Sequence, residues 1–124
     1  MDKLEYIPGD LVIYASLIKE PIAEICEVHE ASYTVKFMHG NFAATSKEIK
    51  PITLTPEILE KNGWRSINGK YALKIKNANY VVLEFTKDGI YTYINENTML
   101  FTIKYIHELQ HFLFGLNINH EMEV

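Results

Sequence analysis

Cysteine is almost missing from this 124-residue chain, which contains only Cys26. An internal disulfide needs two cysteines, so the composition excludes a disulfide-stapled secreted scaffold. Apolar runs of the ~20 residues that a membrane helix needs are also missing. The polar start, residues 1–9, lacks the apolar stretch of a signal peptide. These absences predict a cytoplasmic protein without a membrane partner.

Charge of one sign is only slightly in excess, with 12 basic and 16 acidic side chains and a net charge of −4. The charges are nevertheless unevenly distributed: residues 1–60 carry −5, residues 61–87 carry +5 and residues 88–124 carry −4. The positive block predicts a contact patch at Arg65, Lys74 and Lys76. An ordinary solvated strand face is the alternative interpretation of the same charges.

The first half of the chain has the pattern of short strands. Residues 32–38 alternate apolar and polar side chains, which is typical of a half-buried strand. Turn residues separate this strand from four other predicted short strands: an apolar run at 11–15, a mixed run at 22–29, a return strand at 42–46 and an extended piece at 49–52. Five short strands in this length predict an SH3-like small β-barrel over residues 1–52.

The second half, residues 53–124, predicts a short helix, a sheet and a longer helix. Thr55 can cap the first helix and Gly63 can end it. A four-stranded antiparallel meander follows, with Asn68-Gly69 as its first hairpin turn. Residues 102–116 carry apolar side chains at helical spacing, which predicts a C-terminal helix packed on the meander. Residues 117–124 are polar and predict a loose tail. The expected fold class is therefore α+β.

One motif in the C-terminal helix points to chemistry. His107-Glu108-Leu109-Gln110-His111 matches HExxH, in which two histidines one turn apart can hold Zn²⁺ and the glutamate can act as general base. Catalytic zinc generally has a third protein ligand, and only His120 and two glutamates follow on the expected tail. A helical wheel further places His107 and His111 away from the apolar face. The main expectation is therefore that the protein has no cofactor. The weaker expectation is a zinc site whose ligands are His107, His111 and His120, with Glu108 as general base.

Two segments resemble a known group of proteins. IKPITLTPEILEKNGW, at residues 49–64, and KYIHELQ, at residues 104–110, are similar to segments of small uncharacterised proteins of gut bacteria and their phages. That resemblance brings no established activity. In that group position 111 often holds another residue, such as asparagine, which implies that the helix does not require a second histidine.

Three functions remain open on the sequence alone. The first is a non-catalytic protein-interaction module, phage-derived or self-associating, with a protein partner or a second copy of the chain. The second is the zinc-dependent hydrolase. The third is a nucleic-acid-binding small barrel protein, because basic residues of the positive block neutralise phosphates and nearby tyrosines can stack on bases.

Overall fold

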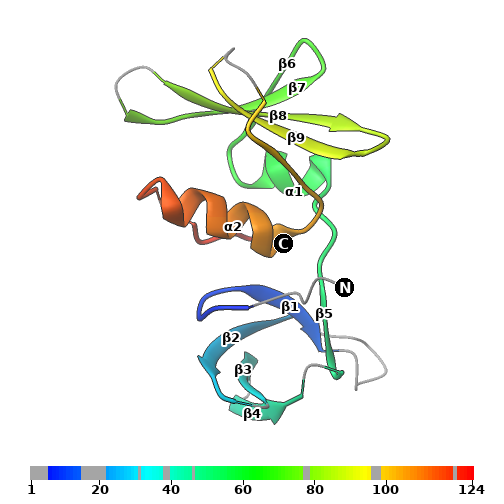
Figure 1. The fold of residues 1–124 in the computed structure, drawn as a ribbon, viewed down its shortest axis with the longest axis vertical. Coiled ribbons are helices and arrows are strands. Elements are labelled where there is room, and N and C mark those ends of the chain that lie inside the picture. Colours follow the sequence, from blue (N-terminus) through cyan, green and yellow to red (C-terminus); the bar gives the residue numbers. More distant parts are fainter. Residues whose placement is uncertain are drawn as a thin grey trace. The chain divides into compact units, whose positions relative to one another are not determined.

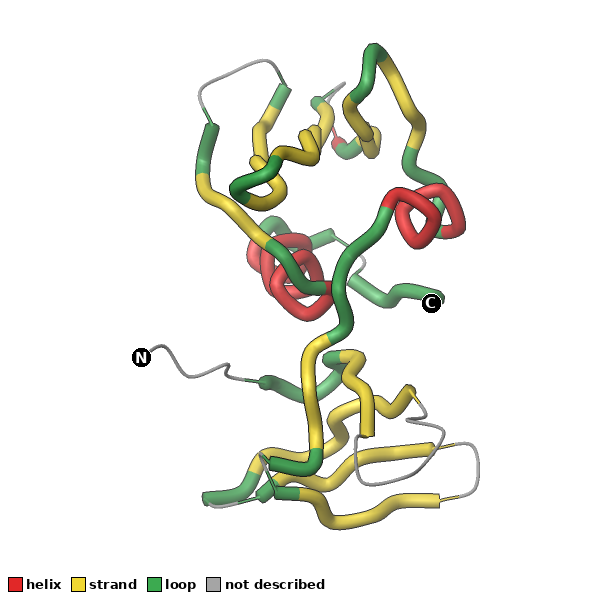
Figure 2. The backbone as a smooth tube through the Cα atoms, turned by 90° about the vertical axis from the view of Figure 1, so that its right-hand side faces the viewer, coloured by secondary structure: helices red, strands yellow, loops and turns green. Residues whose placement is uncertain are grey.

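The computed structural model describes residues 6–14, 22–30, 32–37, 40–45, 47–76, 79–95, 99–118 and 120–124 (Figure 1). The chain divides into two compact units, residues 1–52 and 53–124. Each unit contains one antiparallel sheet, and the second unit also contains two helices (Figure 2). The fold is therefore mixed α+β and mostly strand, as the sequence predicted.

The first unit is a five-stranded sheet in the order β4-β3-β2-β1-β5. Its strands are β1 (Leu11–Tyr14), β2 (Ile22–Val28), β3 (Tyr33–Phe37), β4 (Gly40–Ala44) and β5 (Ile49–Pro51). A β-bulge interrupts the register between Ile25 and Glu27, at the position of Cys26. The buried side chains include Val12, Ile25 and Val35, and they form the core of this unit.

The connection from β4 to β5 forces this sheet to curl. The two strands are its opposite edges, which in a flat sheet would lie about 19 Å apart. The five steps from Ala44 to Ile49 reach at most about 18 Å, and a turn shortens them, since the Glu48 N–H donates to the Thr45 carbonyl at 3.0 Å. The edges must therefore approach each other. No ladder joins β4 to β5 among the described strands, so the closed barrel expected from the sequence is not seen.

The second unit begins with the helix α1 (Pro56–Lys61), and its ends follow the sequence signals. The Thr55 hydroxyl accepts the N–H of Ile58 at 3.4 Å. Gly63 has a φ of +86°, and the Trp64 N–H donates to the carbonyl of Leu59 at 3.1 Å. This is the glycine-terminated helix end that the sequence predicted.

The sheet of the second unit has five strands rather than the expected four, in the order β10-β9-β8-β7-β6. Its strands are β6 (Arg65–Ile67), β7 (Lys70–Lys74), β8 (Tyr80–Thr86), β9 (Gly89–Ile94) and β10 (Phe101–Ile103). Asn68 and Gly69 both have positive φ in the turn between β6 and β7, as that pair predicted. The buried Thr92 holds β10 in place, since its hydroxyl donates to the Phe101 carbonyl at 2.8 Å.

The helix α2 (Ile106–Gly115) is shorter than predicted, because Thr102 and Ile103 belong to β10 and Tyr105 is the extended N-cap. Asn117 ends it with a φ of +60°. Figure 1 shows α1 and α2 on the same side of the second sheet. Within the described residues, no helix combines the length and apolarity needed to cross a membrane.

The residues after α2 are not the loose tail that the sequence predicted. The side-chain amide of Asn62 donates to the carbonyl of Glu123 at 2.7 Å and accepts its N–H at 2.8 Å. The Lys61 ammonium donates to the carbonyl of Val124 at 3.0 Å. The side chain of Gln110 donates to the carbonyl of His120 at 3.2 Å. Side chains at the end of α1 and on α2 therefore hold the backbone of this segment, whatever its own side chains.

Candidate functional site

The glutamate of the HExxH motif is committed to the start of α2. Glu108 is the third residue of the helix, and its Oε1 accepts the N–H of Lys104 at 2.8 Å and the N–H of Tyr105 at 3.0 Å. Both donors lie before the first turn, where the helix itself provides no acceptor. The carboxylate also faces the positive end of the helix dipole. Oε1 of Glu108 is therefore committed to the helix start, and a general base at this position would have to use the other carboxylate oxygen.

The first motif histidine is buried, which corrects the helical-wheel prediction. His107 is only 2% exposed, and its ring stacks on Tyr105 with 5.9 Å between centroids and 14° between planes. The prediction counted Tyr105 as part of the apolar face and left Gln110 out of it. In the structure Tyr105 precedes the helix and Gln110 is buried. Both changes shift the buried face of the helix toward His107.

Burial also determines the protonation of His107. Removal from water lowers its pKa to about 4, because the charged imidazolium loses its hydration. Neighbouring Glu108 opposes this shift and the nearby His111 ring adds to it. His107 is therefore neutral at pH 7. A neutral imidazole can bind a metal, but this one is enclosed and stacked rather than open to solvent.

The remaining motif residues do not complete a metal site. The rings of His107 and His111 lie 5.6 Å apart between centroids and nearly perpendicular. His120, the third expected ligand, packs instead on Phe114, with 5.0 Å between ring centroids. Within the described part of the chain, no three His, Cys, Asp or Glu side chains gather as a possible ligand set.

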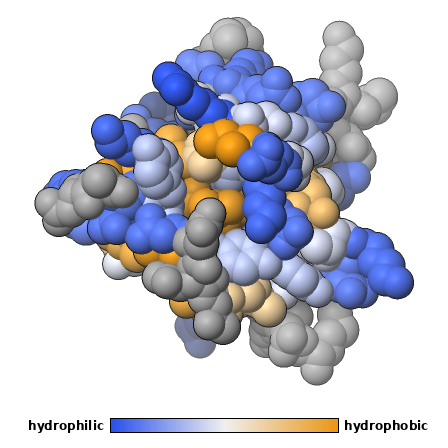
Figure 3. Space-filling model, turned by 90° about the horizontal axis from the view of Figure 1, so that it is seen from above, coloured by the Kyte–Doolittle hydropathy of each residue, from blue (hydrophilic) through white to orange (hydrophobic). Residues whose placement is uncertain are grey.

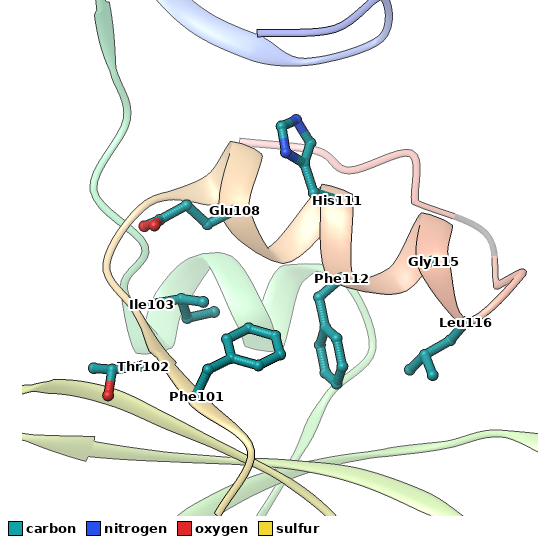
Figure 4. Close-up of a pocket in the computed structure, with 8 residues that line it drawn as sticks. All are labelled: Phe101, Thr102, Ile103, Glu108, His111, Phe112, Gly115 and Leu116. Atoms are coloured by element: carbon teal, nitrogen blue, oxygen red, sulfur yellow. The ribbon is translucent and has the colours of Figure 1, made fainter. Parts of the chain in front are cut away.

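A cavity of about 560 Å³ lies beside this helix (Figure 4). The rings of Phe101 and Phe112, 4.9 Å apart between centroids and packed edge to face, occupy its apolar side. Figure 4 shows the Glu108 carboxylate and the His111 imidazole pointing in different directions, both away from these rings. The polar groups therefore do not converge on one point where a reacting atom could sit.

A second candidate lies on the face of the second sheet that points away from the helices. We call it the outer face, and the strand register defines it. Paired residues share a face, so Arg65 lies with Ala72, Ala72 with Val82, and Val82 with Tyr93. The same register adds further residues at alternate positions of β6 to β9: Ile67, Lys70, Lys74, Tyr80, Glu84 and Tyr91.

The outer face holds a cavity of about 420 Å³. Its floor is apolar, and tyrosine rings, two asparagine amides and one ammonium group surround it. The lining residues are Ile67, Asn68, Lys70, Ala72, Tyr80, Val82, Tyr93 and Asn95. Figure 3, which looks onto the second sheet from above, shows hydrophobic side chains at the centre of this face with hydrophilic ones around them.

Specific contacts hold the polar rim of this cavity. The Lys70 ammonium lies 5.4 Å from the centroid of the Tyr93 ring, a cation–π distance. The Tyr93 hydroxyl donates to Glu84 at 2.8 Å, and this hydrogen bond raises the pKa of Tyr93. Asn95 accepts the backbone N–H of Tyr80 at 2.8 Å and donates to the side chain of Asn79 at 2.9 Å. The rim is thus built from side chains whose positions are fixed by neighbours.

The basic patch expected from the sequence is only partly brought together. Arg65 and Lys74 lie on the outer face, where Lys70 joins them. Lys76 lies beyond the end of β7, in the turn whose Asn79 N–H donates to the Lys76 carbonyl at 3.3 Å. Three exposed cations thus line β6 and β7, and the facing part of β8 and β9 carries Glu84 as its acidic side chain.

Sequence reasoning missed the link between these cations and Tyr93. Within one strand, alternation places Tyr71 opposite Lys74, and Tyr71 does lie on the helix side, since its partner Leu83 is buried. The alternation of residues 80–86 and 90–95 indicates that Tyr80 and Val82 share one face of their strand, and it places Tyr93 on one face of the next strand. Without the register of β7 on β8, however, it could not say which face they share with Lys74.

No protein-family model matches the chain. No curated protein and no solved structure matches it significantly.

Proposed function

We propose that this protein is a non-catalytic interaction module that takes its partner on the outer face of the second sheet. The observation that carries the proposal is the 420 Å³ cavity on that face, with an apolar floor and a rim of tyrosines, amides and Lys70. Concave surfaces with an apolar floor and a few oriented polar groups are the usual form of a binding site. Exposed apolar side chains such as Ile67, 52% exposed, gain most when a partner covers them.

The geometry favours binding over zinc hydrolysis. Glu108 accepts two backbone N–H groups, and His107 is enclosed beside Tyr105. Metal analysis of protein purified without a histidine tag separates the two functions. We expect less than stoichiometric zinc, unchanged in His107→Ala and His111→Ala. Stoichiometric zinc that is lost in both variants would instead support the zinc-hydrolase function.

We further propose that the first unit is a small barrel of the SH3-like kind, opened along one edge. The strand order β4-β3-β2-β1-β5 supports this, because the last strand in the sequence returns to pair with the first one. The short connection from Ala44 to Ile49 supports strong curvature. We expect hydrogen exchange to leave the outer-edge amides of β4 and β5 unprotected, whereas protection of both edges would indicate a closed barrel instead.

Site-specific photo-crosslinking tests the interaction surface. A photoreactive benzoylphenylalanine in place of Ile67 lies at the cavity, whereas the same group in place of Phe114, 58% exposed on α2, is a control of matched exposure. We expect adducts in cell lysate at position 67, lost when Lys70→Glu is added, and none at position 114. Equal adducts at both positions, or none at 67, would overturn the proposal.

A further inference from the structure

We propose that the outer face binds single-stranded nucleic acid, with bases on its tyrosine side and phosphates on its lysine side. The inference rests on the proposed function, since it names the class of partner for the same surface. It depends on how the register arranges cations, aromatic rings and amides around one cavity.

The cations form a strip along one side of the face. Lys70 and Lys74 lie on β7 two pleats apart, and Arg65 lies on the neighbouring edge strand opposite Ala72. Side chains of one strand face repeat about every 7 Å, so the two lysines are about 13 Å apart. All three cations are exposed. An extended polyanion that follows β7 can therefore meet several positive charges in succession.

The aromatic rings lie on β8 and β9, beside this strip of cations. Tyr80, 41% exposed, pairs directly with Lys74 across β8 and β7. The Tyr93 ring carries the Lys70 ammonium, 5.4 Å from its centroid. Rings beside cations suit a base that stacks while its phosphate is neutralised. The side-chain amide of Asn68 at the rim supplies hydrogen-bonding groups for base edges.

This combination favours nucleic acid over an acidic peptide. Glutamate and aspartate side chains would pair with the cations but would leave the floor of Ala72 and Val82 without an apolar partner. A base provides a flat, weakly polar surface for that floor and a charged backbone for the strip. The ligand must be single-stranded, because a duplex buries its base faces in stacking and offers only grooves and backbone.

Fluorescence anisotropy of the full chain with labelled oligo(dT) and oligo(U) of about 15 nucleotides tests the proposal. We expect saturable binding whose log affinity falls with log salt at a slope of about −2, as three phosphate contacts on a single strand predict. Lys74→Gln should reduce that slope by about 0.7. Lys104→Gln, which removes an exposed charge between β10 and α2, is the matched control and should leave the slope unchanged.

The stacking component has its own pair of variants. Tyr80→Ser should weaken binding by about tenfold, as expected for the loss of one stacked base. Tyr80→Phe keeps the ring and should retain the affinity. Thermal unfolding of each variant by circular dichroism separates a lost contact from a lost fold. Equal binding by Tyr80→Ser and the unchanged protein would overturn the stacking geometry.

Other occupants give distinct results. An acidic peptide that binds in a saturable way while both oligonucleotides fail, or a duplex that binds as tightly as the single strands, would overturn the proposal. So would a dimer in sedimentation that Lys74→Glu dissociates. If the oligonucleotides fail but crosslinking at position 67 still yields adducts that protease removes and nuclease does not, the interaction module stands and only its nucleic-acid partner is wrong.

Discussion

The carboxylate of Glu108 accepts the backbone N–H of Tyr105 at 3.0 Å, three residues before it in the chain. The same oxygen accepts the Lys104 N–H at 2.8 Å. A residue that a protease motif would use as its base thus caps the helix that carries the motif.

Replacing Glu108 tests that role. Glu108→Ala leaves two N–H groups at the start of α2 without their acceptor and should lower the free energy of unfolding by about 1–2 kcal/mol. Glu108→Gln keeps a side-chain oxygen and should lose less. Chemical denaturation measures the change, with Glu60→Ala on the exposed side of α1 as the control. Equal stability of Glu108→Ala and the unchanged protein would contradict the capping role.

The buried His107 makes stability depend on pH. Its pKa is about 4 in the folded chain and about 6.5 in the unfolded chain, so the unfolded state binds more protons between these values. Stability from this group is complete above pH 6.5 and is lost as the pH falls to 4, by up to about 3 kcal/mol. His107→Phe removes the titratable imidazole and keeps an aromatic ring beside Tyr105. The difference between the two pH profiles of unfolding isolates His107, and identical profiles would refute its burial.

Gly89 is a position where a side chain does not fit. Its φ is +131°, and a Cβ built there would lie 2.5 Å from Cγ2 of Thr102. Gly89→Ala should therefore cost about 1–3 kcal/mol of stability. The double variant with Thr102→Ser should recover part of the loss, because it removes the clashing methyl group. Gly115→Ala is the matched control: no atom lies within 4 Å of its Cβ, and it should stabilise α2 by about 0.5–1 kcal/mol.

The docking of the last residues depends on Asn62. Asn62→Ala removes both hydrogen bonds to the Glu123 backbone and the one to the Ile58 carbonyl at 2.7 Å. We expect a loss of about 1–3 kcal/mol and fast hydrogen exchange of the Glu123 amide. Asn62→Asp keeps the acceptor and should keep that amide protected. Asn41→Ala on the exposed part of β4 should change neither quantity.

Local features of the fold follow from the sequence because a few neighbouring residues decide them. Thr55 and Gly63 mark the ends of α1, and Asn68-Gly69 adopts the positive φ values of its hairpin turn. Short apolar or alternating runs between turn residues predict most strands of both sheets. Each of these signals acts over a few residues, so no distant contact is needed to interpret it.

The missed features all need partners far along the chain. β10 is a strand because Thr92 and its neighbours on β9 pair with it, which overrides the helical periodicity that begins at Thr102. The last residues are ordered because Asn62, 61 positions away from Glu123, offers an amide that matches a peptide group. Neither pairing leaves a local trace in composition.

The sequence by itself determined an α+β chain with one cysteine, a positive middle block and a set of turns and caps, since each depends on composition or on residues close in the chain. The tertiary structure decided what these residues do. Burial encloses His107, and the Glu108 carboxylate accepts the N–H of Tyr105 at the start of α2. The register of β7 on β8 placed Lys74 beside Tyr80 on one face, because strand pairing, unlike alternation, relates the sides of different strands.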